Sequence, residues 1–242
     1  YYNRQYNWMY YSEPEAELSG RKLYCPRGKV VGGSGSINAM VYVRGQRSDF
    51  DDWAAAGNPG WSFDDVLPYF RKLESHAAAA TDPEHHGAAG PIHITSMKAD
   101  VHPIVHEFLK GCEQLKLPRT HDFNGAQFEG AGIYDLNTKN GERCSSSFAY
   151  LRPAESRSNL TVRSGTLVRR VQFEGKRAVG VVVAGPNGDE VIDASREVIL
   201  AAGAVDTPKL LQLSGVGDPT LLRRHQVPVV QALPAVGRNL QD

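Results

Sequence analysis

The chain has 242 residues, 41% of them hydrophobic, and its 27 basic and 27 acidic residues give a formal net charge of zero. This length allows one large domain or two small ones with a sizeable core. The balanced charge argues against nucleic-acid and membrane-surface partners and favours small neutral ligands. Three widely spaced cysteines argue against a disulfide framework or a zinc knuckle and favour a reducing, cytoplasmic compartment. No apolar run reaches the length of a membrane span.

A glycine-rich stretch, RGKVVGGSGSINAMVYVR, extends from Arg27 to Arg44. Its glycines let the main chain approach a ligand without a Cβ in the way, and Ser34 is a good N-cap residue. Ile37, Met40 and Val41 follow at helical spacing, which predicts a turn that leads into an amphipathic helix. Such a turn directs free backbone N–H groups toward a phosphate or an electron-rich ring. The spacing equally allows a loop that only packs a helix against a sheet.

Three further helices are predicted from capping signals and hydrophobic spacing. They cover residues 48–56, 62–73 and 101–115. Ser62 caps the second of these helices, and Pro103 falls in the first turn of the third. The apolar side of the third helix is predicted to consist of Ile104, Val105, Phe108 and Leu115.

The segment 75–90 is rich in alanine, histidine and glycine, and we expect a flexible surface loop before a short strand, PIHIT. His85 and His86 lie in this segment and superficially resemble a metal-binding pair. His102 and His106, one helical turn apart, do so as well. Because no third ligand is found at a suitable spacing, we expect solvated histidines and no metal site.

The last third of the chain carries strand signals. The runs LVRRVQFEG, RAVGVVVAG and GDEVIDASR are rich in β-branched residues and separated by turns, which predicts an antiparallel meander; NLTVRSG before them is also strand-like. A buried strand, EVILAAGA, is expected next, and Thr207 and Pro208 open a helix that Gly215 ends. This strand, glycine and helix N-terminus form a second place where backbone N–H groups converge on a possible ligand.

No catalytic motif is complete in this chain. None of its G-x-G pairs has the third glycine of a dinucleotide fingerprint, and the segment Gly28–Val30 lacks the hydroxyl of a Walker loop. The nucleophile elbow G-x-S-x-G is absent as well. The residues by themselves therefore indicate part of a cofactor site without an assembled acid, base or nucleophile.

Two segments, GKVVGGSGSINAMVYVRGQRSDFD and GAVDTPKLLQLSGVG, resemble the two signature motifs of the glucose-methanol-choline (GMC) family of flavin oxidoreductases. Other segments resemble family segments in family order, among them GNPGWSFDDVLPYFRKLE, HGAAGPIHIT and VGRNLQD. The resemblance therefore covers essentially the whole chain. Within the family, the chain is most similar to the choline-dehydrogenase-like group of alcohol dehydrogenases and oxidases.

The resemblance implies an α/β fold in which an FAD-binding, Rossmann-like domain with a β-meander is joined by part of a substrate or cap domain. Residues 1–74 and 156–242 are expected in the FAD-binding domain and residues 75–155 in the substrate domain. FAD is expected to bind non-covalently, because Ile37 occupies the position of the histidine that carries the flavin in some members. The implied flavin contacts are Val30, Gly33, Ser34, Asn38, Ala39, Met40 and Val41. Val168 is implied at the adenine end, although an ordinary strand residue is the alternative.

The implied activity is oxidation of an alcohol by hydride transfer to the flavin, with oxygen or a quinone as electron acceptor. Family members carry the dinucleotide glycines before the matched region and the catalytic histidine after it. We therefore expect a central fragment, truncated at both ends, in which none of the eight histidines is catalytic. The alternatives are a family relative with lyase or light-driven decarboxylase chemistry, and an inactive fragment that folds only in part.

Overall fold

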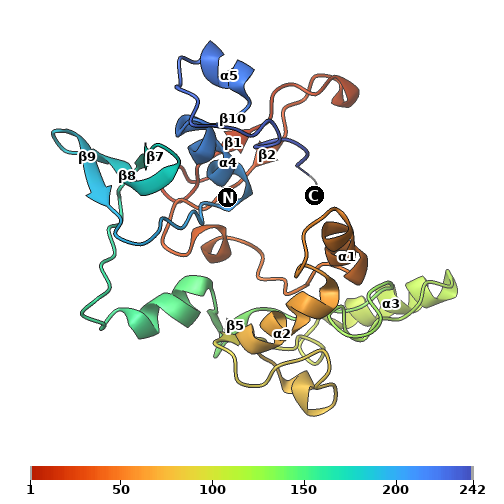
Figure 1. Ribbon diagram of the computed structural model, residues 1–242. Helices are drawn as coiled ribbons and strands as arrows, with labels where there is room; N and C mark the ends of the chain where they lie inside the picture. Colours follow the sequence, from red (N-terminus) through yellow and green to blue (C-terminus); the bar gives the residue numbers. More distant parts are fainter. Residues whose placement is uncertain (1, 241–242) are drawn as a thin grey trace. The chain divides into compact units, whose positions relative to one another are not determined.

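The computed structural model describes residues 2–240 and divides the chain into two compact units, Tyr1–Leu160 and Thr161–Asp242 (Figure 1). The last two residues of the VGRNLQD segment lie outside the described residues. The assignment of the segments 1–74, 75–155 and 156–242 to an FAD-binding and a substrate domain stays a prediction. No helix among the described residues is both long and apolar enough to cross a membrane.

The first unit is built from short helices and two-stranded ladders joined by loops. Its α-helices are α1 (Arg47–Ala55), α2 (Phe63–Leu73) and α3 (Pro103–Gln114). Single helical turns are formed by η1 (Ala16–Leu18), η2 (Gly33–Ser36), η3 (Ala77–Ala80), η4 (Ser147–Leu151) and η5 (Arg152–Ala154). The strand pairs are β1 (Tyr10–Tyr11) with β2 (Tyr24–Cys25), β3 (Glu74–Ser75) with β4 (Ile92–His93), and β5 (Thr138–Lys139) with β6 (Glu142–Arg143). The pair β3–β4 is parallel and the other two are antiparallel.

The three predicted helices of this unit are confirmed, and each starts within two residues of its expected position. The capping signals explain the starts. The Ser62 hydroxyl accepts a hydrogen bond from the Asp65 N–H, and the Asp65 carboxylate accepts one from the Ser62 N–H, which together form a capping box for α2. Pro103 begins α3, where a proline has no intrahelical N–H bond to lose.

The prediction for the apolar side of α3 is wrong for three of its four residues, whereas the fourth, Val105, is partly buried. The exposed fractions of Ile104, Phe108 and Leu115 are 66%, 69% and 77%, whereas Leu109 and Cys112 are buried. Leu109 and Cys112 are three positions apart and therefore share one helix face. Because α3 is apolar over a wide arc, its sequence supports either face, and only the packing of the rest of the unit selects the one that is buried.

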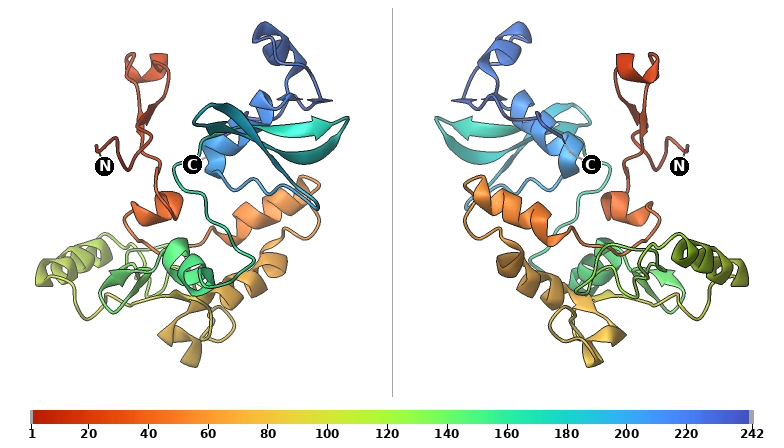
Figure 2. Two further views of the ribbon diagram at one scale, coloured as in Figure 1. Left: turned by 90° about the vertical axis from the view of Figure 1, so that its left-hand side faces the viewer. Right: turned by 90° about the vertical axis from the view of Figure 1, so that its right-hand side faces the viewer.

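The second unit combines a three-stranded sheet with two helices (Figure 2). Its strands β7 (Val168–Glu174), β8 (Arg177–Gly185) and β9 (Gly188–Asp193) form the predicted antiparallel meander in the order β7-β8-β9. The helices are α4 (Gly203–Leu213), which packs on β7, and α5 (Pro219–Arg224). Strands β10 (Val216–Gly217) and β11 (Gln231–Ala232) pair in parallel. The core of the unit contains Val171, Val182, Val183, Val216 and Leu222.

Two expectations for the second unit are wrong. NLTVRSG forms no strand, and neither does EVILAAGA, in which Ile199 is 77% exposed. An extended apolar segment becomes a strand only when its backbone N–H and C=O groups find a partner strand, and no described residues pair with this one. Helix α4 exists as predicted but begins at Gly203, four residues before the expected opening at Thr207.

Candidate functional site

The glycine-rich stretch forms the single 3₁₀ turn η2. No helix directly follows this turn, so the prediction of an amphipathic helix there is wrong. Ile37 has a φ of −128° and Met40 a φ of 65°, so the backbone leaves helical geometry directly after η2. Val41 instead forms an isolated antiparallel bridge with Leu136, and the Asn137 N–H donates to the Met40 carbonyl. Pairing with a distant segment therefore prevails over the local helical spacing, and a positive φ is unusual for methionine.

Two kinds of glycine shape this turn. A Cβ on Gly28 would lie 2.2 Å from the Gly33 carbonyl oxygen, and a Cβ on Gly32 would lie 2.3 Å from Ser36 Oγ. These two glycines let the turn fold tightly on itself. A Cβ on Gly33 or Gly35 would meet no atom within 4 Å, so the backbone there is open on the side where a side chain would stand. An open backbone of this kind allows a ligand to approach closely.

Side-chain hydrogen bonds hold the ends of the turn. Ser34 Oγ accepts a bond of 3.1 Å from the Gly28 N–H. Asn38 Oδ1 accepts bonds from the Met40 N–H at 3.0 Å and from Arg143 Nη1 at 2.7 Å. Because the amide oxygen of Asn38 is bound twice, the orientation of its side chain is defined. Arg143 is a contact that the sequence analysis missed, since no local pattern connects positions so distant in the chain.

The predicted cofactor residues of the first unit lie within one short stretch of the chain, residues 30–41. Ser34, Asn38, Ala39 and Val41 are exposed, and Val30, Gly33 and Met40 are partly buried. This stretch thus offers small apolar side chains beside an open backbone and an oriented amide. Val168 lies in the other unit, where it is partly buried at the first position of β7.

The N-terminus of α4 is the second predicted ligand-facing segment. Gly203 begins the helix with a φ of 84°, and a Cβ there would meet no atom within 4 Å. The N-cap residue Ala202 supplies no side-chain hydrogen bond to the first turn. Backbone N–H groups at such a terminus carry partial positive charge and suit an anionic group such as a phosphate.

A separate cavity of about 220 Å³ lies in the first unit, between the start of α1 and a loop that contains Phe123 and Phe128. Its lining also includes Arg44, Phe63 and His85. None of the predicted cofactor residues lines this cavity. It is therefore distinct from the surface formed by the glycine-rich turn.

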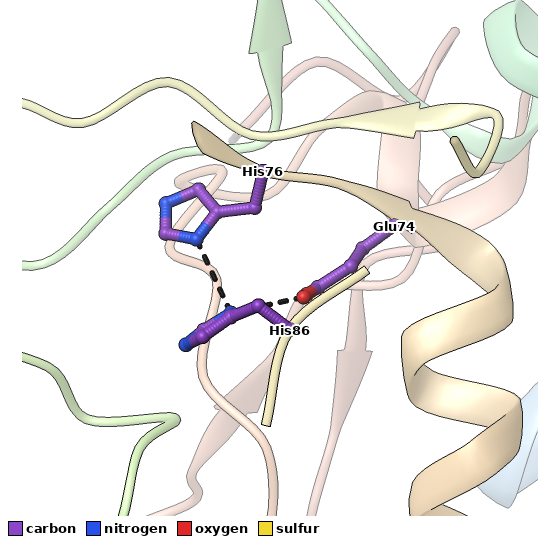
Figure 3. A group of neighbouring side chains, drawn as sticks. All are labelled: Glu74, His76 and His86. Carbon is purple, nitrogen blue, oxygen red and sulfur yellow. Dashed lines mark hydrogen bonds and ion pairs between the residues drawn. The ribbon is translucent and has the colours of Figure 1, made fainter. Parts of the chain in front are cut away.

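A buried polar cluster in the first unit consists of Glu74, His76 and His86 (Figure 3). Glu74 and His86 are 0% and 2% exposed and His76 is 7% exposed, so the prediction of a flexible surface loop with solvated histidines is wrong for this part of the segment 75–90. Gly87 explains the tight fold of the loop, because a Cβ there would lie 1.8 Å from the Arg71 carbonyl oxygen. The spacing Glu74-x-His76 before His86 was the available sequence signal, and it was missed.

The electrostatics of this cluster favour ionised groups. Burial raises the pKa of Glu74, but the hydrogen bond with His86, the charge of Arg44 and the Tyr42 hydroxyl outweigh burial and lower the pKa to about 2. Burial lowers the pKa of His86, but its contacts with Asp122 and Glu74 prevail and raise the pKa to about 9. Burial raises the pKa of Tyr42, whose hydroxyl donates to Glu74 Oε2 at 2.7 Å.

The family model for GMC oxidoreductases matches residues 15–242 of this chain. Human mitochondrial choline dehydrogenase is 47% identical to it over 238 residues, which cover 98% of this chain and 40% of that protein. The oxygen-dependent choline dehydrogenase of Pseudomonas putida is 45% identical over 243 residues, which cover 99% of this chain and 43% of that protein. The chain thus spans about two fifths of the length of these curated relatives.

Solved structures of oxidoreductases superimpose well on the structure of this chain. An FAD-dependent oxidoreductase from Chaetomium thermophilum has a TM-score of 0.90 at 34% identity, covering 98% of this chain and 43% of that chain. Pyridoxine 4-oxidase from Mesorbium loti has a TM-score of 0.88 at 33% identity, covering 95% of this chain and 45% of that chain. The predicted α/β fold class and the resemblance of the two signature motifs are confirmed, and the chain belongs to the GMC oxidoreductase family.

Proposed function

We propose that this chain contributes the cofactor-binding surface of an FAD-dependent oxidoreductase that oxidises the CH–OH group of choline or a closely related amino alcohol. The observation that carries the proposal is the 45–47% identity to choline dehydrogenases over nearly the whole chain, which includes both glycine segments. The geometry supports it, because the first of these segments presents an open backbone and not a surface covered by its own side chains.

The residues of the glycine-rich turn fit a flat heteroaromatic ring with polar edges. Ala39 and Val41 offer exposed apolar contacts, and Asn38 offers an amide whose orientation is fixed by Arg143. The open backbone at Gly35 allows close approach of the ring. The first turn of α4 suits the pyrophosphate, and the backbone of Val168 is proposed to contact the adenine end. Ile37 has no nucleophilic atom, so the cofactor is proposed to bind non-covalently.

A bound FAD would supply the acceptor for the hydride of the alcohol carbon. The described residues bind and orient the cofactor, and we propose that the base for the hydroxyl proton is not one of their histidines. His76 and His86 are buried in the polar cluster, and His93 is held by the Thr138 carbonyl at 2.8 Å. His85 pairs with Asp82 at 2.9 Å. The remaining histidines, His102, His106, His121 and His225, are exposed and lie outside the glycine-rich turn.

Anaerobic reduction of the bound flavin tests the proposed function. We expect choline to bleach the visible flavin absorbance of the full-length protein, whereas tetramethylammonium, which lacks a hydroxyl group, leaves it unchanged. A panel of primary alcohols without an ammonium group measures how much of the rate depends on the cation. Retention of the oxidised spectrum with every alcohol would rule out the proposal.

The electron acceptor is proposed to be either oxygen or a quinone. Stopped-flow reoxidation of the alcohol-reduced protein separates the two acceptors, because each is added alone and the recovery of flavin absorbance is timed. Fast recovery with oxygen identifies an oxidase, and recovery only with a soluble quinone analogue identifies a dehydrogenase. Recovery with neither acceptor would contradict both.

A further inference from the structure

The cluster of Glu74, His76 and His86 directs three possible metal-binding atoms to one point. His86 Nδ1 lies 2.9 Å from Glu74 Oε1 and 3.2 Å from His76 Nδ1, and all three atoms lie within 4.8 Å of one another (Figure 3). The local sequence explains the arrangement. Glu74 and His76 are two positions apart at strand β3, so both side chains leave the backbone on the same side, and the loop returns His86 to them.

The other nitrogen of each histidine faces a carboxylate. His86 Nε2 lies 2.7 Å from Asp122 Oδ2, and His76 Nε2 lies 3.2 Å from Asp135 Oδ2. A carboxylate at this position holds the imidazole in the tautomer with the proton on Nε2, which leaves the lone pair on Nδ1. The Nδ1 atoms of both rings then face the cluster, where Glu74 Oε1 is also an acceptor. Three acceptors around one point require a cation or an added proton between them.

Glu74 has supporting contacts of its own. Its second oxygen, Oε2, accepts from Arg44 Nη2 at 2.6 Å and from the Tyr42 hydroxyl at 2.7 Å. Oε1 accepts from the Gly87 N–H at 2.8 Å. These bonds fix the direction of the carboxylate, as hydrogen bonds to ligating groups commonly do at metal sites.

The spacing of the three atoms suits a tetrahedral ion. Zinc binds histidine nitrogen and carboxylate oxygen at about 2.0–2.2 Å, which places neighbouring ligand atoms of a tetrahedron about 3.3–3.6 Å apart. The separations from His86 Nδ1 to Glu74 Oε1 and to His76 Nδ1, 2.9 and 3.2 Å, need only a small expansion, and the third pair of atoms lies within 4.8 Å. Two imidazoles and one carboxylate are also a common ligand set for zinc, with water in the fourth position.

The charges near the cluster support the same conclusion. Glu74, Asp122 and Asp135 contribute three carboxylates, and Arg44 contributes one positive charge. These groups leave an excess of negative charge around the two imidazoles, in a largely buried site. Unpaired buried charge is costly, and one divalent cation balances it. The partly exposed Asp122, whose side chain is 23% accessible, gives this side of the cluster contact with solvent.

We propose that Glu74, His76 and His86 bind a divalent transition-metal ion of the zinc type, with Asp122 and Asp135 orienting the two histidines. The ion would join the loop between β3 and β4 to the segments that carry Asp122 and Asp135. This site is independent of the proposed alcohol oxidation, since it rests on other residues. It revises the expectation of no metal site, which rested on the apparent lack of a third ligand.

Metal analysis of the flavin-loaded full-length protein tests the proposal. The protein is purified without a histidine tag from zinc-supplemented cultures, and zinc is counted per chain by mass spectrometry. We expect about one zinc ion per chain, with nitrogen and oxygen neighbours at about 2.0–2.2 Å in the zinc X-ray absorption spectrum, including imidazole rings. His76→Gln should lose at least nine tenths of this zinc. His106→Gln, which changes an exposed histidine of α3, should retain it.

A variant outside the ligand set separates metal binding from folding. Asp135→Asn should weaken zinc binding about 10–100-fold in a chelator competition, as loss of a carboxylate partner does at other zinc sites. If His76→Gln does not fold, the wild-type absorption spectrum decides, because sulfur neighbours or the absence of imidazole would refute this ligand set. Wild-type protein that binds no zinc after supplementation would refute the proposal and leave a proton as the shared cation.

Discussion

Arg143 Nη1 donates a hydrogen bond of 2.7 Å to Asn38 Oδ1, and the two residues are 105 positions apart in the sequence. Asn38 Oδ1 also accepts from the Met40 N–H, and Arg143 reaches the Gly35 carbonyl at 3.3 Å. One guanidinium from β6 thus holds both the end of η2 and the residue proposed to face the flavin. The geometry of the proposed cofactor surface therefore depends on a residue that is remote in the sequence.

We predict that Arg143→Ala weakens FAD binding without unfolding the protein. The variant frees the Asn38 amide and the Gly35 carbonyl, and a partly exposed bond of this kind contributes about 1 kcal/mol, which corresponds to about a fivefold rise in the dissociation constant. Titration of apoprotein with FAD, followed by flavin fluorescence, measures the change. Arg157→Ala, at an exposed arginine of the same unit, is the matched control and should bind FAD like the wild type. Equal affinity of all three proteins would show that Asn38 needs no such support.

A pair of glycine variants distinguishes the two roles of the glycine-rich turn. In Gly35→Ala the new methyl group meets no protein atom within 4 Å, so the apoprotein should unfold at the same temperature as the wild type. The flavin content should fall, because the methyl group occupies the side of the backbone that the flavin ring is proposed to approach. In Gly28→Ala the methyl group would clash with the Gly33 carbonyl at 2.2 Å, so both stability and flavin content should fall. Thermal unfolding of apoprotein and the ratio of flavin to protein absorbance measure the two effects.

Gly111→Ala provides the control for these variants, because Gly111 lies within α3 and a Cβ there also meets no atom within 4 Å. Alanine in a helix interior is favoured over glycine by about 0.5–1 kcal/mol, so this variant should be slightly stabilised and retain its flavin. Full flavin content in Gly35→Ala would argue for the alternative in which the turn only packs.

The sequence predicted the elements whose causes are local. The capping box of Ser62 and Asp65 and the proline that opens α3 act within one helical turn, and both helices are found where these signals lie. The meander strands are likewise joined by short turns, and each is paired with its neighbour along the chain. In these cases the information that determines the element lies within the element or next to it.

The predictions that failed concern parts of the chain whose conformation depends on distant partners. The apolar spacing after η2 predicts a helix, but Val41 pairs with Leu136, and the backbone of Met40 takes a positive φ. The polar cluster needs Glu74, His86 and Asp122, which come from three separate parts of the chain. Periodicity carries no information about such contacts, so it could locate neither, and only the spacing Glu74-x-His76 before His86 gave a weak signal for the cluster.

The buried side of α3 is tested by neighbouring positions of the helix. Leu109 is 1% exposed and Phe108 is 69% exposed. Leu109→Ala leaves a cavity in the core and should lower the free energy of unfolding by about 2–5 kcal/mol. Phe108→Ala removes a larger side chain from the surface and should change it by less than about 0.5 kcal/mol. Urea unfolding measures both values, and a larger loss from Phe108→Ala would mean that the face predicted from the sequence is the one that packs.

In the second unit, Ser214 joins the sheet to the end of α4. Its hydroxyl accepts from the Val171 N–H at 2.8 Å and donates to the Leu210 carbonyl, and the side chain is buried. Ser214→Ala leaves the Val171 N–H buried without an acceptor, which costs about 1–3 kcal/mol. We therefore expect a lower urea midpoint with an unchanged denaturant slope.

The exposed Ser195 offers the comparison for this variant, since Ser195→Ala removes the same hydroxyl from the surface and should shift the free energy of unfolding by less than about 0.5 kcal/mol. Hydrogen exchange at the Val171 amide gives a second measure, because this N–H should exchange faster in Ser214→Ala than in Ser195→Ala. Equal exchange at Val171 in the two variants would mean that another acceptor replaces the serine, and that α4 is held on β7 by apolar packing alone.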